Sequence, residues 1–172
     1  FEYMDDIIVV DLGSIFPRED MPGVDLVVGA DEKGNLFARV AELSAKAEGV
    51  GRIHSCAINE VSSIFPAYSS GERTRSFLKV QDGCNYRCSY CTIPKARGES
   101  RNISIATAVA EAERIAASGI REVVLTGVNT GDFGRTTGES FLDLLKALNA
   151  VEGIERYRIS SIEPNLLTEE IL

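Results

Sequence analysis

Short apolar runs alternate with amphipathic segments over the second half of the chain, from Ser76 onward. The expected strands are residues 77–80, 122–126 and 157–162. A helical segment precedes each of the last two strands. Strands that alternate with helices pair in parallel through right-handed crossovers. The sequence therefore predicts an α/β fold built on parallel strands.

Both helical segments have recognisable ends. Ser104 is a candidate N-cap, and Gly119 ends the first helix. Ser140 and Asp143 form a start that resembles a capping box, and Gly153 closes the second helix. The side chains expected to face the core are Val109, Ala112, Ile115 and Ala116 in the first helix, and Phe141, Leu142, Leu145 and Leu148 in the second.

The first half of the chain also reads as part of an α/β layer. Residues 7–10 and 24–28 are expected strands, and residues 52–58 form a further extended piece. A helix is expected over residues 31–47, with Leu36, Val40 and Leu43 on one face. Residues 66–71 are rich in turn formers and predict a linker to the second half.

Three cysteines follow the first strand of the second half in the run GCNYRCSYC, residues 83–91. Cys84, Cys88 and Cys91 are spaced closely enough to converge on one metal centre. Three thiolates can hold an iron–sulfur cluster by three of its irons, which leaves the fourth iron open. An open metal position distinguishes a reactive site from a closed structural one.

Two other uses of these cysteines are weaker. A structural zinc site needs four ligands, and His54 and Cys56 lie some distance upstream as the candidates to complete it. A disulfide framework is the weaker of the two, because four cysteines are sparse in 172 residues and nothing at the N-terminus resembles a secretory signal. Thiols this close also suit one metal better than a bridge between distant segments.

The cysteine run and its flanking segments resemble the radical S-adenosylmethionine (SAM) methylthiotransferases. The residues that carry the resemblance are 73–84 (RTRSFLKVQDGC), the cysteine run, 92–98 (TIPKARG), 125–134 (LTGVNTGDFG) and 157–164 (YRISSIEP). The branch that they resemble most acts on threonylcarbamoyladenosine in tRNA. The cysteine run alone would indicate only the wider superfamily.

This resemblance implies a domain organisation. Residues 1–65 would be the remnant of an N-terminal α/β methylthiotransferase domain, and residues 66–75 a linker. Residues 76–172 would be the first half of a partial (β/α) barrel, whose chemistry lies at the C-terminal ends of its strands. The family's N-terminal domain carries three further cysteines for a second cluster, but no cysteine precedes Cys56 here. Both ends of the sequence look like cuts in a longer protein.

The resemblance also implies the cofactors. Cys84, Cys88 and Cys91 would bind a [4Fe–4S] cluster, and SAM would chelate the open iron before its reductive cleavage to a 5′-deoxyadenosyl radical. Tyr90 matches the position that lies against the adenine; the alternative is a packing tyrosine.

The loop after the second strand of the barrel half is a second candidate cofactor contact. Gly127 permits close backbone approach, and Asn129 can both donate and accept hydrogen bonds, which suits the amino-acid end of SAM. An ordinary glycine turn is the other explanation. Glu163, after the third strand, is polar and well placed, or simply caps a helix that begins near Pro164.

The expected function is therefore methylthio transfer to threonylcarbamoyladenosine next to the anticodon, with tRNA and an electron-donating reductase as partners. A sister activity on isopentenyladenosine or on a ribosomal protein would share the cysteine run. A non-catalytic metal-binding or RNA-binding module from a decayed enzyme is the alternative from another class. This chain by itself is expected to be inactive in the full reaction.

Charge and hydropathy limit the remaining possibilities. The net charge is −8, which argues against general binding of nucleic acid through a basic surface. Residues 72–101 nevertheless hold seven basic and three acidic side chains, a local charge of +4 that suits RNA phosphates, the SAM carboxylate or merely a solvated face. With no apolar run of about 20 residues, we expect no membrane span. We expect a cytoplasmic location, because exposed iron–sulfur chemistry needs a reducing compartment and no export signal is visible.

Overall fold

The computed structural model describes residues 9–11, 24–29, 31–43, 52–54, 56–69 and 74–172. The chain divides into two compact units. The first comprises residues 1–63 and 88–98, and the second comprises residues 64–87 and 99–172. The segment with the three cysteines is therefore shared between the units.

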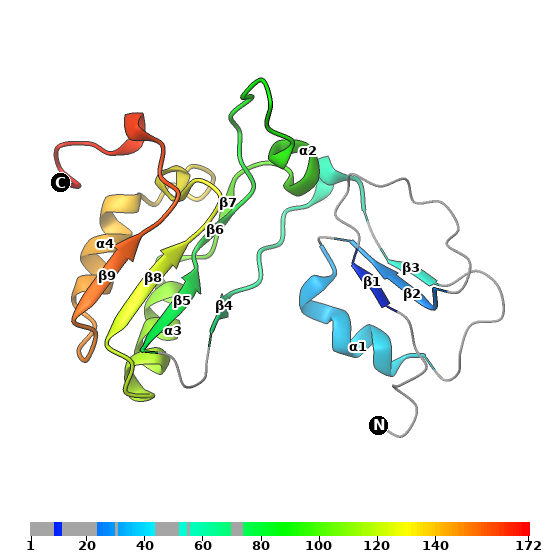
Figure 1. The fold of residues 1–172 in the computed structure, drawn as a ribbon, viewed down its shortest axis with the longest axis horizontal. Coiled ribbons are helices and arrows are strands. Elements are labelled where there is room, and N and C mark those ends of the chain that lie inside the picture. Colours follow the sequence, from blue (N-terminus) through cyan, green and yellow to red (C-terminus); the bar gives the residue numbers. More distant parts are fainter. Residues whose placement is uncertain (1–8, 12–23, 30, 44–51, 55, 70–73) are drawn as a thin grey trace. The chain divides into compact units, whose positions relative to one another are not determined.

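The first unit contains a three-stranded parallel sheet in the order β1-β2-β3 (Figure 1). Its strands are β1 (Val9–Asp11), β2 (Leu26–Val28) and β3 (Arg52–His54). The helix α1 (Leu36–Ala41) lies between β2 and β3 in sequence. Leu26, Val28 and Val40 form a buried cluster, against which Leu36 and Leu43 pack. The predicted apolar face of this helix is confirmed.

The helix of the first unit is shorter than the sequence predicts over its described part. Residues Lys33–Asn35 form a 3-10 turn, η2, and the α-helix begins only at Leu36. Gly34 lies in that turn, and glycine disfavours a regular helix by about 1 kcal/mol relative to alanine. Residues 44–47 of the predicted helix and residues 7–8 of the first predicted strand lie outside the described residues. The extended piece predicted at 52–58 ends as a strand at His54, and the 3-10 turn η3 (Ile58–Glu60) follows.

The second unit is built on a four-stranded sheet in the order β4-β5-β8-β9 (Figure 1). Its strands are β4 (Ala67–Tyr68), β5 (Arg75–Lys79), β8 (Glu122–Thr126) and β9 (Arg156–Ile159). The strands β5, β8 and β9 are parallel, whereas β4 pairs antiparallel with β5. The predicted α/β fold with parallel strands is confirmed.

Two elements of this sheet differ from the sequence prediction. The segment expected as a turn-rich linker contains β4, which is held to β5 by a hydrogen bond from the Ser76 hydroxyl to the Ser69 carbonyl at 2.7 Å. The third barrel strand ends at Ile159 and not at residue 162. Ser161 has a φ of 56°, which an extended strand does not permit.

Both helices of the second unit begin and end where the sequence predicts. Ser104 Oγ accepts a hydrogen bond from Thr107 N at 3.1 Å at the start of α3 (Ile105–Ala117). Ser140 Oγ accepts one from Asp143 N at 3.0 Å at the start of α4 (Phe141–Asn149). Gly119 and Gly153 follow these helices with φ values of 85° and 93°, the left-handed conformation that glycine adopts without strain.

The two helices pack with alternate residues of the sheet in one apolar core. On β5 and β8 the core residues Leu78 and Leu125 are register partners, so they lie on the same face. Of the residues predicted to face this core, Val109, Ala116 and Leu145 are half-buried and pack against it, and Leu142 is half-buried. Leu144, which was not predicted, is fully buried. The buried set comprises Leu78, Val80, Ile103, Ala108, Ala112, Ile115, Val123, Leu125, Phe133, Phe141, Leu144, Leu148 and Val151.

A second, two-stranded sheet closes the base of the cysteine segment. The strand β6 (Gln81–Asp82) pairs antiparallel with β7 (Arg101–Asn102). Val80 N donates to Thr126 O at 2.9 Å, and Ile103 N donates to Val80 O at 3.1 Å, which continues the pairing onto the main sheet. The segment between β6 and β7 holds all three cysteines and the short helix α2 (Ile93–Arg97). No helix in the described ranges is both long and apolar enough to cross a membrane.

Candidate functional site

The first cysteine of the segment lies directly after the antiparallel strand β6. Cys84 follows Gly83, whose φ of 71° reverses the chain at the end of β6. The Cys84 side chain is half-buried, and its Sγ accepts a hydrogen bond from Tyr86 N at 3.4 Å. Hydrogen bonds from backbone N–H groups to a cysteine sulfur are one means by which proteins set the reduction potential of iron–sulfur clusters.

Cys88 and Cys91 lie at the two ends of one tight turn. Cys91 N donates to Cys88 O at 3.1 Å across Ser89 and Tyr90. Cys88 is exposed and Cys91 is half-buried, and none of the four cysteines forms a disulfide. Within the described ranges, however, no three His, Cys, Asp or Glu side chains gather closely enough to hold a metal ion. The donor set fits an iron–sulfur cluster chemically, but the assignment of the three thiols as its ligands stays a prediction.

The buried carboxylate of Asp82, at the base of the cysteine segment, forms ion pairs with two basic side chains. Asp82 Oδ2 lies 2.7 Å from Lys79 Nζ and 3.2 Å from Arg101 Nη2, and Asp82 Oδ1 accepts a hydrogen bond from Gly83 N at 2.8 Å. Burial opposes ionisation of this carboxyl, but the ion pairs and the N–H outweigh it, so the pKa of Asp82 lies below its ordinary value. These contacts of Asp82 hold together the β6–β7 pair, from which the segment with the cysteines extends.

Gln81 joins the cysteine segment to the loop after β8. Its side chain is fully buried. Its Nε2 lies within hydrogen-bond distance of the carbonyls of Asp82 and Gly83 and of the Ser100 hydroxyl, at 3.0, 2.7 and 2.9 Å. Its Oε1 accepts from Val128 N at 2.8 Å and from Asn129 N at 2.9 Å. Sequence reasoning missed this residue, although an amide directly after a buried apolar strand is an available signal.

The structure gives Gly127 and Asn129 packing roles. A Cβ at position 127 would lie 2.7 Å from Gln81 Oε1 and 3.0 Å from Thr130 Cγ2, so only glycine fits without displacement. The Asn129 side chain is buried, and its Oδ1 accepts a hydrogen bond from Glu163 N at 3.2 Å. Its Nδ2 is buried without a hydrogen-bond partner among the described residues. Contact of either residue with SAM stays a prediction.

Further bonds join the loop after β8 to the chain after β9. Thr130 N donates to Ser161 O at 2.9 Å, and Thr130 Oγ1 donates to Ser160 O at 3.0 Å. Asp132, in the 3-10 turn η4 (Thr130–Asp132), is buried, and its Oδ2 has no hydrogen-bond partner within the described part of the chain. The carboxyl ends of β8 and β9 thus form one connected polar layer.

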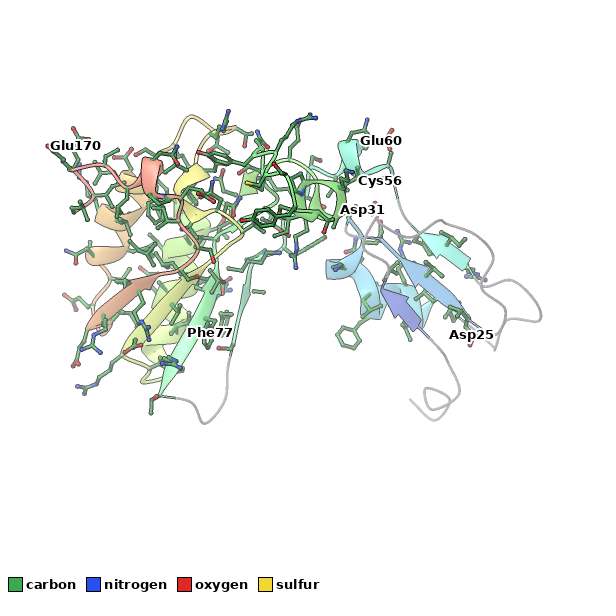
Figure 2. The ribbon with its side chains drawn as sticks, turned by 45° about the horizontal axis from the view of Figure 1, so that its top comes forward. Asp25, Asp31, Cys56, Glu60, Phe77 and Glu170 are labelled. Atoms are coloured by element: carbon green, nitrogen blue, oxygen red, sulfur yellow. The ribbon has the colours of Figure 1, made fainter. Side chains whose placement is uncertain are left out.

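The remaining candidate residues lie on the cysteine segment or before it. Tyr90 is 94% exposed, so the structure gives it no packing role in the chain itself. Tyr86 accepts a hydrogen bond at its hydroxyl from Asn165 Nδ2 at 2.8 Å, a contact that the sequence did not predict. Cys56 is half-buried at the approach to η3 (Figure 2), and His54 ends β3.

Comparison with known proteins identifies the superfamily. The model of the Radical SAM superfamily matches residues 78–172, which include the end of β5, the cysteine segment, β8 and β9. The chain belongs to the radical SAM superfamily. The α/β arrangement with the cysteines after the first parallel strand agrees with that membership.

Within this superfamily, the chain is similar to methylthiotransferases. The threonylcarbamoyladenosine tRNA methylthiotransferase MtaB of Bacillus subtilis is 36% identical over 163 residues, which are 91% of this chain and 36% of that protein. The protein of the same name from Chlamydia pneumoniae is 44% identical over 108 residues, 62% of this chain and 25% of that protein. The ribosomal protein uS12 methylthiotransferase RimO of Bdellovibrio bacteriovorus is 32% identical over 161 residues, 90% of this chain and 35% of that protein. The matched part of the chain thus covers between a quarter and little more than a third of the length of these relatives.

Proposed function

We propose that this chain is part of a radical SAM methylthiotransferase that modifies threonylcarbamoyladenosine in tRNA. The observation that carries the proposal is the likeness to relatives of that name, at 36% identity over 91% of the chain and at 44% over a shorter stretch. The cysteine run lies inside the matched superfamily region. The partners would be tRNA and an electron-donating reductase.

Cys84, Cys88 and Cys91 would hold a [4Fe–4S] cluster. Their support is chemical: all three are thiols outside any disulfide, and Cys84 Sγ already accepts a backbone N–H. When bound there, the cluster would supply the electron that cleaves SAM. The chain's own contribution is the segment that carries the ligands, held at its base by the β6–β7 ladder and by the charges around Asp82.

Asn129 and Tyr90 would contact SAM. The support for Asn129 is its Nδ2 donor, which has no partner among the described residues and suits a carboxylate. Because that atom is buried, neighbouring side chains must move aside for the ligand to reach it. The support for Tyr90 is its exposed ring, which offers a stacking surface to a purine. Gly127 would allow the backbone of the loop after β8 to lie close to the Gln81 amide, next to the proposed contact of Asn129 with SAM.

Metal analysis tests the cluster assignment. The chain is reconstituted anaerobically with iron and sulfide, and bound iron, acid-labile sulfide and the electron paramagnetic resonance (EPR) signal after reduction are measured. About four irons and four sulfides per chain are expected. Cys88→Ala should lose the cluster, while the matched control Cys56→Ala should keep it. Zinc without sulfide in the wild-type chain would instead support a non-catalytic metal-binding module.

A chimera tests the activity and the substrate. The segment of the Bacillus subtilis relative that matches this chain is replaced by residues 1–172, and the chimera is expressed in cells that lack that relative. Nucleosides from total tRNA are then examined by mass spectrometry. Threonylcarbamoyladenosine carrying a methylthio group is expected, and the Cys88→Ala chimera should yield none. Absence of that product from a chimera that holds its cluster would contradict the proposed substrate.

A ribosomal protein is the second candidate substrate, because relatives named for uS12 match at 32% and 33% identity. The same cells provide the comparison, since the mass of protein uS12 reports its own methylthiolation. A chimera built on the Bdellovibrio bacteriovorus relative serves as the matched control. Modification of uS12 by the first chimera, without modification of tRNA, would move the assignment to that branch.

A further inference from the structure

We propose that Gln81 is a positioning residue that holds the loop after β8 at a fixed place relative to the first cysteine, and thereby sets the affinity for SAM. This inference rests on the proposed function. Gln81 does not touch SAM or the cluster in the proposal. It acts through the backbone of the residues on either side of it.

The contacts of Gln81 fall into two groups that belong to different loops. The amide nitrogen faces the carbonyls of Asp82 and Gly83, directly before Cys84. The amide oxygen receives both backbone N–H groups of Val128 and Asn129. These residues lie 47 and 48 positions along the chain from Gln81. The planar Gln81 amide therefore fixes the start of the cysteine segment and the loop after β8 in position relative to each other.

Glutamine suits this position because the carboxamide supplies donors at one end and an acceptor at the other. The site is fully buried, so each backbone group that lost its partner would remain without water. Glutamate would retain the oxygen that Val128 and Asn129 need but would present a second oxygen to two carbonyls. Methionine has nearly the same shape and would satisfy neither loop.

The packing around Gln81 shows that the separation between the loops is tightly defined. A Cβ on Gly127 would lie 2.7 Å from Gln81 Oε1 and 3.0 Å from Gln81 Cβ. The loop after β8 therefore lies directly against the Gln81 side chain along its length. Ser100, at the far end of the cysteine segment, also bonds Gln81 Nε2 at 2.9 Å and donates its own N–H to Asn85 Oδ1 at 2.8 Å. The C-terminal end of the cysteine segment is thus hydrogen-bonded to the same Gln81 amide as its N-terminal end.

The test compares Gln81→Glu and Gln81→Met with the wild-type chain after reconstitution with iron and sulfide. We expect both variants to hold wild-type iron and sulfide, because no thiol is changed. We expect them to bind SAM roughly tenfold more weakly. The reason is that the loss of positioning should cost about as much binding free energy as one buried hydrogen bond contributes. The EPR signal of the reduced centre should also shift less when SAM is added.

Amide hydrogen exchange in the metal-free chain gives a readout that does not depend on the cluster. The amides of Val128 and Asn129 should exchange faster in Gln81→Met, which has no acceptor, and near the wild-type rate in Gln81→Glu, which keeps one. Ile115→Val, a core change in α3 outside both loops, serves as the control for general loss of stability. It should weaken SAM binding by less than twofold.

Either of two affinity results would overturn the positioning role: wild-type SAM affinity in Gln81→Met, or equal weakening by Ile115→Val. Unchanged exchange at Val128 and Asn129 in Gln81→Met would also overturn it, whatever metal is bound. If Gln81→Met fails to fold, Gln81→Glu carries the affinity measurement. A wild-type chain that binds no iron would instead contradict the proposed function, while the exchange data would still decide the role of Gln81.

Discussion

Asn165 donates a hydrogen bond from Nδ2 to the Tyr86 hydroxyl over 2.8 Å. Tyr86 lies two residues after Cys84, and Asn165 lies in η5 (Pro164–Leu166), the 3-10 turn that follows β9. Gln81 joins the same cysteine segment to the loop after β8. The start of this segment is therefore bonded to the chain beyond two neighbouring strands.

Tyr86→Phe should remove this tie with little cost to the fold. The bond is exposed, so the free energy of unfolding should fall by only about 0.5–1 kcal/mol. Hydrogen exchange at Tyr86 and Arg87 should rise, because their segment loses an anchor. Tyr68→Phe, on the edge strand β4, is the matched control and should change neither quantity. Equal exchange in wild type and Tyr86→Phe would show that the bond does not restrain the segment.

Gly127→Ala should disturb the contact with Gln81. The new methyl group would meet Gln81 Oε1 at 2.7 Å, so the loop or the amide must shift, at a cost of about 1–3 kcal/mol. Urea unfolding measures that loss, and SAM binding should weaken with it. Gly119→Ala provides the comparison: it meets no neighbouring atom within 4 Å but has a φ of 85°, so it should lose stability without losing SAM affinity.

Asp82→Asn should destabilise the base of the cysteine segment at neutral pH. Arg101 would remain buried without its carboxylate partner, which costs about 3 kcal/mol. The pKa of Asp82 is lower in the fold than in the unfolded chain, because the ion pairs outweigh burial. Its stabilising contribution is therefore complete above the unfolded pKa of about 4 and is lost as the pH falls through the folded pKa.

Urea unfolding of wild type and Asp82→Asn between pH 7 and pH 3 checks this prediction. The difference in unfolding free energy should shrink toward the acid end, as the pH falls through the unfolded pKa of Asp82 and toward its lower folded pKa. Glu113→Gln, an exposed site on α3, should show little difference at any pH. A gap between Asp82→Asn and wild type that is constant over this range would contradict the ionic role of Asp82.

Tyr157→Phe should be neutral or slightly stabilising at pH 7. The Tyr157 hydroxyl is buried without a hydrogen-bond partner among the described residues, so its removal takes away an unsatisfied polar group. Burial raises the pKa of Tyr157 to about 12. Because the folded pKa exceeds the unfolded value of 10.0, wild type should lose stability relative to Tyr157→Phe as the pH rises from about 10 to 12. Unfolding curves at pH 8 and pH 11 measure the change.

Local signals in the sequence were sufficient to locate the main elements of the second unit. The strand at 122–126 and the caps at Ser104 and Ser140 depend on neighbouring residues, and the structure confirms them. The start of the helix at Leu36 is also a local matter, because Gly34 disfavours the regular helix that the apolar spacing alone predicts. Leu144 was missed because a helix in a core can bury residues on either side of the expected stripe.

The polar layer at the strand ends was beyond prediction from local patterns. The strands β6 and β7 are two residues long and polar, so neither shows the alternation that indicates a strand. The Gln81 amide meets backbone groups almost fifty positions away, and no periodicity marks such a contact. The cysteines were found readily because their spacing is itself the signal, whereas their supporting residues belong to the tertiary structure.

The ladder of β6 with β7 has a consequence for the order of assembly. Both ends of the cysteine segment are brought together by the protein's own backbone bonds, before any metal is needed. The sheet of the second unit can therefore form without a metal. In the proposed function, iron would then be inserted into a closed excursion of an already folded chain.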